Sequence, residues 1–413
     1  MLGCSPDDIA RGGRFTKKVQ DNIELNYREY RAKKTVLQSY PVKLYVEPTQ
    51  RCNLDCITCS YSRRREKEDM PLPLFRRIEK ELFPYAAEVN FFLTGEPTLA
   101  RHLPEMMAVS ANYTFLPKIF INGAALSDEL AEMLVAIGCF VTVSFDAASP
   151  ESFERIRRGA KFSAVVGNIV KLQKLQKRIA NPRFHLRLAS TLGLHNIEEA
   201  PGIVEFACQH DINDVMLGGL DSGGWDVTGM LLVDPQGSLR CIRQSIESAD
   251  RHRIRFSCPK RIGETVLEKN NNWADFPLPI DGYAPFYLES LNPYDGDCGY
   301  SWLQTGIRVN GSIVSCCQLE HVMGNYNEDD FLKIWNSEPY TKLRSQKNYT
   351  VCRGRFCNLT TSSIFNAGGQ RDSGLRIEKN WLNRAWENCI KFIRWLLLQK
   401  ARCIRAMKWG PGF

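Results

Sequence analysis

The chain has 413 residues, more than one hydrophobic core usually organises, so two or three domains are expected. Apolar residues make up 44% and charged residues 24%, which excludes intrinsic disorder. No run approaches the roughly 18 apolar residues of a membrane span, and none forms a signal peptide, so a cytoplasmic location is expected. The net charge is +8, but residues 375–413 hold nine basic and two acidic residues, which leaves +1 for the body and no charge argument for nucleic-acid binding.

Short β-rich runs alternate with helical patterns through the first half of the chain. Six runs are predicted as strands: 42–47, 89–93, 118–121, 141–145, 184–191 and 215–217. Helices are predicted between them, at 74–82, 103–108, 128–137, 163–177 and 197–210. The alternation indicates repeated βαβ crossovers, hence a parallel sheet with helices outside, either open or part of a β/α barrel. In both architectures ligands bind at the carboxyl ends of the strands.

The alternation weakens after residue 217. The following 80 or so residues are rich in Gly, Asp, Asn and Pro, with one helical stretch near 237–251 and a short strand-like run at 254–257. We interpret this region as connector and substrate loops. The predicted domains are an N-terminal extension at 1–40, the barrel at 41–220, the connector at 221–297, a small second unit at 298–358, and a linker with a basic tail at 359–413.

Fifteen cysteines are too many for core filling, and stable disulfides are rare in the cytoplasm, so metal or catalytic use is the default. Cys52, Cys56 and Cys59 form a Cys-x3-Cys-x2-Cys run directly after the first predicted strand. Structural zinc normally takes four ligands, whereas three thiolates on a four-iron cluster leave one iron open for a substrate. Three cysteines alone do not exclude a zinc site that a distant residue completes.

Three further motifs follow successive predicted strands. They are Thr94-Gly95-Glu96-Pro97, Asn122-Gly123 and Ser144-Phe145-Asp146. Each alone could be an ordinary turn or helix cap, but together with the cysteine run they resemble the radical S-adenosylmethionine (SAM) enzymes. The resemblance implies a [4Fe–4S] cluster on the three cysteines. It also implies that the cofactor-binding residues for SAM are Gly95, Glu96, Ser144 and Asp146.

Two positions depart from the pattern of that family. Thr94 replaces the first glycine of the Gly-Gly-Glu motif that holds the methionine amino group. Thr58 stands where a bulky residue usually lies beside the adenine, which puts that contact in question and leaves Tyr61 as a substitute.

The later cysteines lie in a pattern similar to the SPASM domain found in many of these enzymes. Between them stand Gly311, Met323-Gly324-Asn325, Lys333-Ile334-Trp335-Asn336-Ser337 and Leu343-Arg344. The resemblance implies an auxiliary [4Fe–4S] cluster held by Cys298, Cys316, Cys352 and Cys357. Cys317 is an alternative to Cys316, and a four-cysteine zinc site is the alternative to the cluster. Ile334 and Trp335 are expected in the core.

The expected fold class is therefore α/β: a partial (β/α)6 barrel, a small C-terminal iron–sulfur SPASM-like domain and a basic helical tail. The implied reaction is reductive cleavage of SAM to a 5′-deoxyadenosyl radical, which abstracts a hydrogen atom from the substrate. The electron would come from a reductant such as flavodoxin or ferredoxin. Cys241, Cys258 and His321 are candidates for a second hydrogen donor.

Three hypotheses for the function remain open. A single auxiliary cluster favours an oxidoreductase or isomerase that oxidises or epimerises a small molecule or sugar. A peptide-modifying maturase with a separate leader-binding partner is the second, and a non-catalytic iron–sulfur or zinc protein is the third.

The basic tail adds a hypothesis about location. Residues 381–400 carry apolar side chains at helical three- and four-residue steps among basic ones. This pattern is more often that of a C-terminal helix packed on the body, and the alternative is a basic amphipathic helix on an anionic membrane surface. Peripheral contact with the inner face of the membrane is therefore an expectation alongside the cytoplasmic one.

Overall fold

The computed structural model describes residues 15–59, 68–219, 234–259, 261–262, 265–267, 299–316 and 321–345, all within one compact unit. The linker at 359–374 and the predicted tail helix at 381–400 lie outside the described residues. So do several single positions, namely Tyr61, Cys298, Cys317, Cys352 and Cys357. No helix in the described ranges is long and apolar enough to cross a membrane.

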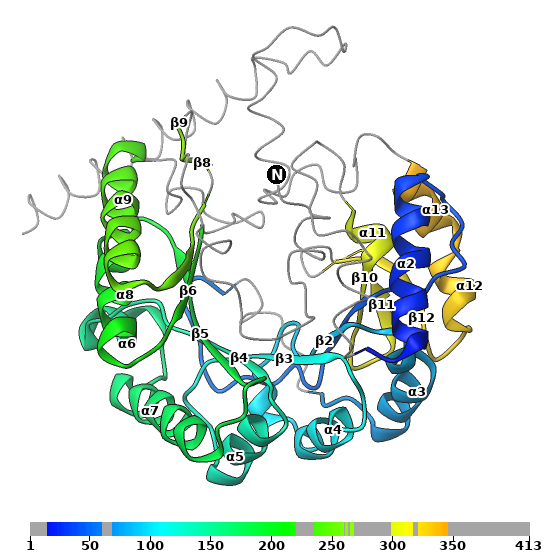
Figure 1. Ribbon diagram of the computed structural model, residues 1–413, viewed down its shortest axis with the longest axis horizontal. Helices are drawn as coiled ribbons and strands as arrows, with labels where there is room; N and C mark the ends of the chain where they lie inside the picture. Colours follow the sequence, from blue (N-terminus) through cyan, green and yellow to red (C-terminus); the bar gives the residue numbers. More distant parts are fainter. Residues whose placement is uncertain are drawn as a thin grey trace, which may run out of the picture. The chain divides into compact units, whose positions relative to one another are not determined.

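A curved sheet forms the body of the described structure (Figure 1). Its parallel strands pair in chain order: β1 (Lys43–Val46), β2 (Glu88–Asn90), β3 (Leu116–Ile121), β4 (Phe140–Ser144), β5 (His185–Leu192), β6 (Asp214–Gly219) and β7 (Arg255–Ser257). All six predicted strands are present, and the expected parallel partial barrel is confirmed. The sheet also has a seventh parallel strand. The region interpreted as connector and substrate loops supplies it, together with the helix α9 (Pro235–His252) that precedes it.

The sheet continues on the other side of β1. Strand β10 (Gln304–Ile307) pairs in parallel with β1, and β11 (Ser312–Val314) and β12 (Val322–Asn325) follow in antiparallel order. Three helices belong to this segment: α11 (Tyr300–Leu303), α12 (Phe331–Trp335) and α13 (Glu338–Ser345). A separate hairpin joins β8 (Arg261–Ile262) to β9 (Thr265–Val266).

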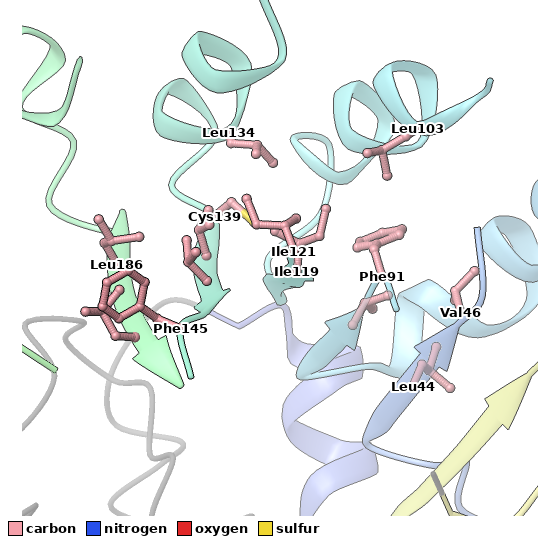
Figure 2. Packing of buried hydrophobic residues seen from close by; sticks show 14 of the residues in the cluster. Leu44, Val46, Phe91, Leu103, Ile119, Ile121, Leu134, Cys139, Phe145 and Leu186 are labelled. Carbon is pink, nitrogen blue, oxygen red and sulfur yellow. The ribbon is translucent and has the colours of Figure 1, made fainter. Parts of the chain in front are cut away.

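Helices cover the outer side of the curved sheet (Figure 1). They are α3 (Leu72–Leu82), α4 (Leu103–Ser110), α5 (Asp128–Ala136), α6 (Pro150–Ile156), α7 (Phe162–Ile179) and α8 (Ala200–Gln209), with short 3-10 turns η1 (Phe83–Tyr85), η2 (Pro97–Leu99) and η3 (Ile197–Glu199). Figure 2 shows Leu44 and Ile119 from the strands among the same buried side chains as Leu103 and Leu134 from the helices. Because strand side chains alternate between faces, Lys43 and its neighbours on that face point to the inner side of the sheet.

The N-terminal extension contains a helix that the sequence analysis did not predict, α2 (Lys17–Arg31). Its buried face includes the polar side chains of Asn22, Asn26 and Glu29, which obscure the apolar pattern in the sequence. The Asn26 side chain donates to the Trp302 carbonyl oxygen (2.7 Å). Helix α2 therefore packs against the segment that carries β10.

Arg344 organises the later segment. Its guanidinium lies over the ring of Trp335 (4.3 Å) and donates to the carbonyl oxygens of Thr35, Ser301 and Trp335 (2.8–2.9 Å). Trp335 is fully buried and Ile334 is 3% exposed, so both lie in the core, as expected from the sequence. One cation thus ties α13 to α11 and to the residues that follow α2.

The amino-terminal ends of the last parallel strands carry a buried ion cluster. Asp214 on β6 is 0% exposed and accepts hydrogen bonds from His185, Arg187 and Arg255 at 2.8–2.9 Å. Although burial opposes its ionisation, Arg187, His185 and Arg255 hold the pKa of Asp214 well below its usual value. These contacts join β5, β6 and β7, which explains why so short a strand as β7 is held in the sheet.

Replacing Asp214 with Asn tests this cluster. We expect the free energy of unfolding at pH 7 to fall by about 3 to 5 kcal/mol, because the buried cations Arg187 and Arg255 lose a carboxylate that binds both. The pKa of Asp214 is lowered in the folded state, so its ionised carboxylate stabilises the wild-type protein at pH values above the ordinary carboxyl pKa. This contribution is lost as the pH falls through the lowered pKa. Denaturation monitored by circular dichroism measures the free energy of unfolding and its dependence on pH. Asp211→Asn, which removes an exposed partner of Lys177, should leave the midpoint unchanged.

Candidate active site

The loop that follows β1 carries the three clustered cysteines, and the structure describes all of them. Cys52, Cys56 and Cys59 are partly exposed. The start of the loop is anchored by Arg51, whose guanidinium donates to both carboxylate oxygens of Asp69 (3.0 and 2.6 Å). Burial opposes ionisation of that carboxyl, but hydrogen bonds from Arg51 and Thr49 hold the pKa of Asp69 below its usual value. The loop lies at the carboxyl end of β1, as the sequence predicted, and the Arg51–Asp69 pair anchors its start.

Gly95 brings the loop after β2 against the loop after β1. A Cβ atom at Gly95 would lie 2.3 Å from the carbonyl oxygen of Thr49 and 2.7 Å from that of Arg51. The next backbone N–H, that of Glu96, donates to the Arg51 oxygen at 2.7 Å. Only glycine fits here, because any side chain would overlap backbone atoms that cannot move without moving the cysteine loop.

Glu96 connects this turn to the loop after β3. The side chain is buried, at 3% exposed, and accepts hydrogen bonds from the Asn122 backbone N–H (2.6 Å) and from the Thr98 hydroxyl (2.7 Å). Burial raises the pKa of Glu96 to about 6, and these hydrogen bonds limit the rise. The carboxylate is therefore mostly ionised at pH 7, the state that suits an ammonium ligand.

Asn122 was part of the Asn-Gly turn in the sequence but was not assigned a site role. Its amide nitrogen donates to the side-chain oxygen of Asn53 (2.8 Å) and lies 3.9 Å from the sulfur of Cys52. Since its backbone N–H contacts Glu96, one residue links the buried carboxylate to the cysteine loop. The following Gly123 has φ +73°, a conformation that favours glycine.

Thr94 has a partner that explains its departure from the family pattern. Its hydroxyl donates to the carboxylate of Glu47, a fully buried residue directly after β1. The second oxygen of Glu47 accepts the backbone N–H of Val309 after β10 (3.2 Å). Burial raises the pKa of Glu47, opposed by the hydrogen bonds from Thr94 and Val309. A glycine at position 94 would remove one donor from this carboxylate.

Ser144 and Asp146 lie at the end of β4, but in different surroundings. Ser144 is partly exposed, whereas Asp146 is 1% exposed. Asp146 accepts hydrogen bonds from the Thr191 backbone N–H (2.8 Å) and the Ser190 hydroxyl (3.2 Å), and forms an ion pair with Arg157 (2.8 Å). The sequence analysis did not single out Arg157, because an arginine after a short helix has no distinctive pattern.

The described part of the later cysteine group is Cys316, which is partly exposed and follows β11. Of the three candidate hydrogen donors, Cys258 is buried after β7, with its pKa raised to about 12 by burial. Cys241 lies on α9 and His321 is exposed before β12. Within the described ranges, no three His, Cys, Asp or Glu side chains are arranged to hold a single metal ion.

Two family models match the chain. The radical SAM superfamily matches residues 46–207, and the iron–sulfur cluster-binding SPASM domain matches residues 298–358. The chain belongs to the radical SAM superfamily. It is a radical SAM enzyme with a SPASM domain, and its cofactors are [4Fe–4S] clusters and SAM.

Similar proteins span most of this radical SAM chain. "PqqA peptide cyclase" of Xanthomonas oryzae is 22% identical over 349 residues, which cover 82% of this chain and 85% of the relative. "Fe-coproporphyrin III synthase" of Methanosarcina barkeri is 26% identical over 385 residues, covering 85% and 89%. Among solved structures, Streptococcus suis SuiB bound to precursor peptide SuiA has a TM-score of 0.58 at 15% identity, covering 79% of this chain and 71% of that one. Native anSMEcpe with bound AdoMet has a TM-score of 0.57 at 15% identity, covering 88% and 100%.

The donor set at the first loop fits a thiolate-bound cluster. Three cysteines lie within eight residues, and N–H groups of Asn122 and Arg157 face the sulfurs of Cys52 and Cys56 at 3.9 and 4.0 Å. Such N–H groups stabilise the negative charge of thiolate ligands and tune an iron–sulfur cluster. Cys52, Cys56 and Cys59 are therefore the residues that would hold the cluster.

Replacing Gly95 with Ala tests the close contact of the two loops. We expect the variant to lose most of the iron of the first site after anaerobic reconstitution, because the added methyl displaces Thr49 and Arg51 and with them the cysteine loop. Iron content per chain measures this. Gly167→Ala in helix α7 is the matched control, since nothing lies within 4 Å of its Cβ position, and it should keep its iron. Equal iron in both variants would contradict the role of Gly95.

Proposed function

We propose that this chain cleaves SAM reductively and that the resulting radical abstracts a hydrogen atom from a substrate bound at the carboxyl ends of the strands. The observation that carries the proposal is the convergence of the Cys52–Cys59 loop with Glu96 and Asn122 through direct hydrogen bonds. When bound and reduced, the cluster supplies the electron that cleaves SAM. The protein contributes binding, orientation and the exclusion of water.

We assign the SAM contacts residue by residue. Glu96 is a buried, ionised carboxylate beside the cysteine loop, and it suits the methionine amino group. The backbone of Gly95 lies at the same turn. Ser144 is partly exposed and offers a hydroxyl to the ribose, whereas Asp146 is covered and already holds Arg157. We assign Asp146 to the same site because it follows Ser144 at the end of β4 and holds Arg157 there.

The class of substrate is a separate proposal, more specific than SAM cleavage itself. We favour a peptide substrate presented by a separate leader-binding partner. Its support is the similarity to a peptide cyclase over more than four fifths of both chains. The second candidate is oxidation or epimerisation of a small molecule or sugar, which is favoured by a cysteine group sufficient for one auxiliary cluster.

Substrate-dependent SAM cleavage separates these candidates. A synthetic precursor peptide encoded beside this gene should increase the rate of 5′-deoxyadenosine formation and gain or lose mass. A response to sugars of a neighbouring glycan pathway, with none to the peptide, would support the second candidate. The reductant, flavodoxin or ferredoxin, is part of the same proposal.

Replacing Cys52, Cys56 and Cys59 together with Ala tests the catalytic assignment. We expect 5′-deoxyadenosine formation to be abolished, because no thiolate remains to hold the cluster that binds SAM. Chromatography of the quenched reaction measures the product. Cys208→Ala, a partly exposed cysteine on α8, serves as the control and should retain full turnover. Wild-type protein that binds zinc and forms no 5′-deoxyadenosine would refute the proposal.

Replacing Cys298, Cys316, Cys352 and Cys357 with Ala tests the auxiliary site. About four irons per chain should be lost while the first cluster remains, since the two sets of thiolates are separate. Substrate turnover should fall more than uncoupled SAM cleavage. Single Cys316→Ala and Cys317→Ala variants distinguish the two candidate ligands. Unchanged iron content in the fourfold variant would rule out the assignment.

A further inference from the structure

Arg157 lies opposite Cys56, and backbone hydrogen bonds hold it there. The backbone N–H groups on either side of Cys56, those of Asp55 and Ile57, donate to the carbonyl oxygens of Arg158 and Ile156 (2.9 and 3.0 Å). The two hydrogen bonds thus join the residues on either side of Cys56 to the residues on either side of Arg157. The register of the cysteine loop against the segment after α6 is therefore set by backbone contacts, which a substitution at position 157 leaves in place.

The side chain of Arg157 turns toward the cysteine loop and is covered. It is 12% exposed, with one terminal nitrogen 4.0 Å from the Cys56 sulfur and the other 2.8 Å from Asp146 Oδ2. Its Nε is buried and has no hydrogen-bond partner among the described residues. Because the guanidinium is buried away from solvent, it interacts strongly with any charge that develops beside it.

Asp146 fixes the direction of this cation. Its other oxygen, Oδ1, is occupied by the Thr191 backbone N–H and the Ser190 hydroxyl, so the carboxylate has a single orientation. The ion pair is neutral as a whole, but the guanidinium nitrogen that faces the Cys56 sulfur is not the one that binds Asp146. The pair is therefore a dipole with its positive end at the sulfur.

We propose that Arg157 is a positioning residue that raises the reduction potential of the first iron–sulfur cluster, with Asp146 holding its guanidinium against Cys56. Adding one electron to a thiolate-bound cluster makes it more negative by one charge. A buried cation at one ligand sulfur stabilises that reduced state over the oxidised one. The inference rests on the proposed function, because it takes the three cysteines as ligands of a redox-active cluster.

A merely structural role for the ion pair predicts something different. If Arg157 only joins the loops after β4 and β5 to the cysteine loop, its loss would lower stability and iron content. The clusters that do assemble would then keep their wild-type potential. The potential of assembled cluster is thus the measurement that separates the two roles.

The experiment is an electrochemical titration of the full chain, reconstituted anaerobically and followed by electron paramagnetic resonance, without SAM or substrate. At a fixed applied potential, we expect Arg157→Met to decrease the ratio of reduced to oxidised first cluster about tenfold. This corresponds to a reduction potential that is about 59 mV more negative. Arg157→Lys, which keeps the charge but not the planar fork, should shift by less. Arg158→Met removes the same charge from the exposed neighbouring residue and should leave the potential unchanged.

Each result decides the question. A wild-type potential in Arg157→Met with normal iron content, or an equal shift in Arg158→Met, would overturn the inference. If Arg157→Met assembles no cluster, Arg157→Gln keeps N–H donors without the charge and takes its place. Loss of the cluster in both variants would assign Arg157 a structural role. In wild-type protein, absence of a cluster or of SAM cleavage would instead count against the proposed function.

Discussion

The backbone contact between Gly95 and the residues just before Cys52 is the constraint on which the site depends. The turn after β2 can lie against the carbonyl groups of Thr49 and Arg51 only because position 95 lacks a Cβ. That closeness lets the Glu96 N–H bond to Arg51 and sets its carboxylate beside Asn122. Asn122 then reaches Asn53 and Cys52. Hydrogen bonds thus join the loops after three strands into one surface that includes the cysteine loop.

The two ends of the sheet use buried charge differently. At the amino-terminal end, Asp214 is saturated by three cationic or imidazole partners, and the cluster holds strands together. At the carboxyl end, Glu96 has an elevated pKa of about 6 and Arg157 keeps a buried N–H without a described partner. Arg157 also faces the Cys56 sulfur, so a buried charge at this end lies beside the cysteine loop. This contrast is the one expected when one end of a parallel sheet serves stability and the other serves chemistry.

The sequence predicted the strands and the motif loops because both signals are local. Runs of apolar residues identified β1 to β6, and Gly95, Asn122 and the three cysteines follow them directly. What it did not predict depends on distant partners. The burial of Asn26 and Glu29 on α2 requires Trp302 and Ser39. The strand-like run at 254–257 was predicted, but its place in the parallel sheet depends on the distant Asp214. Arg157 gains its place opposite Cys56 only through backbone bonds a hundred residues away in sequence.

The pairing of β1 with β10 has a consequence for the order in which the chain matures during synthesis. One edge of β1 obtains its partner, Gln304–Ile307, only after some 250 further residues have been translated. Glu47 likewise lacks the N–H of Val309 until then. The first strand of the sheet therefore emerges from the ribosome long before it can be completed, and such non-local pairing is slow to form. A stalled or truncated chain would therefore present the cysteines after a strand that lacks one of its two neighbours.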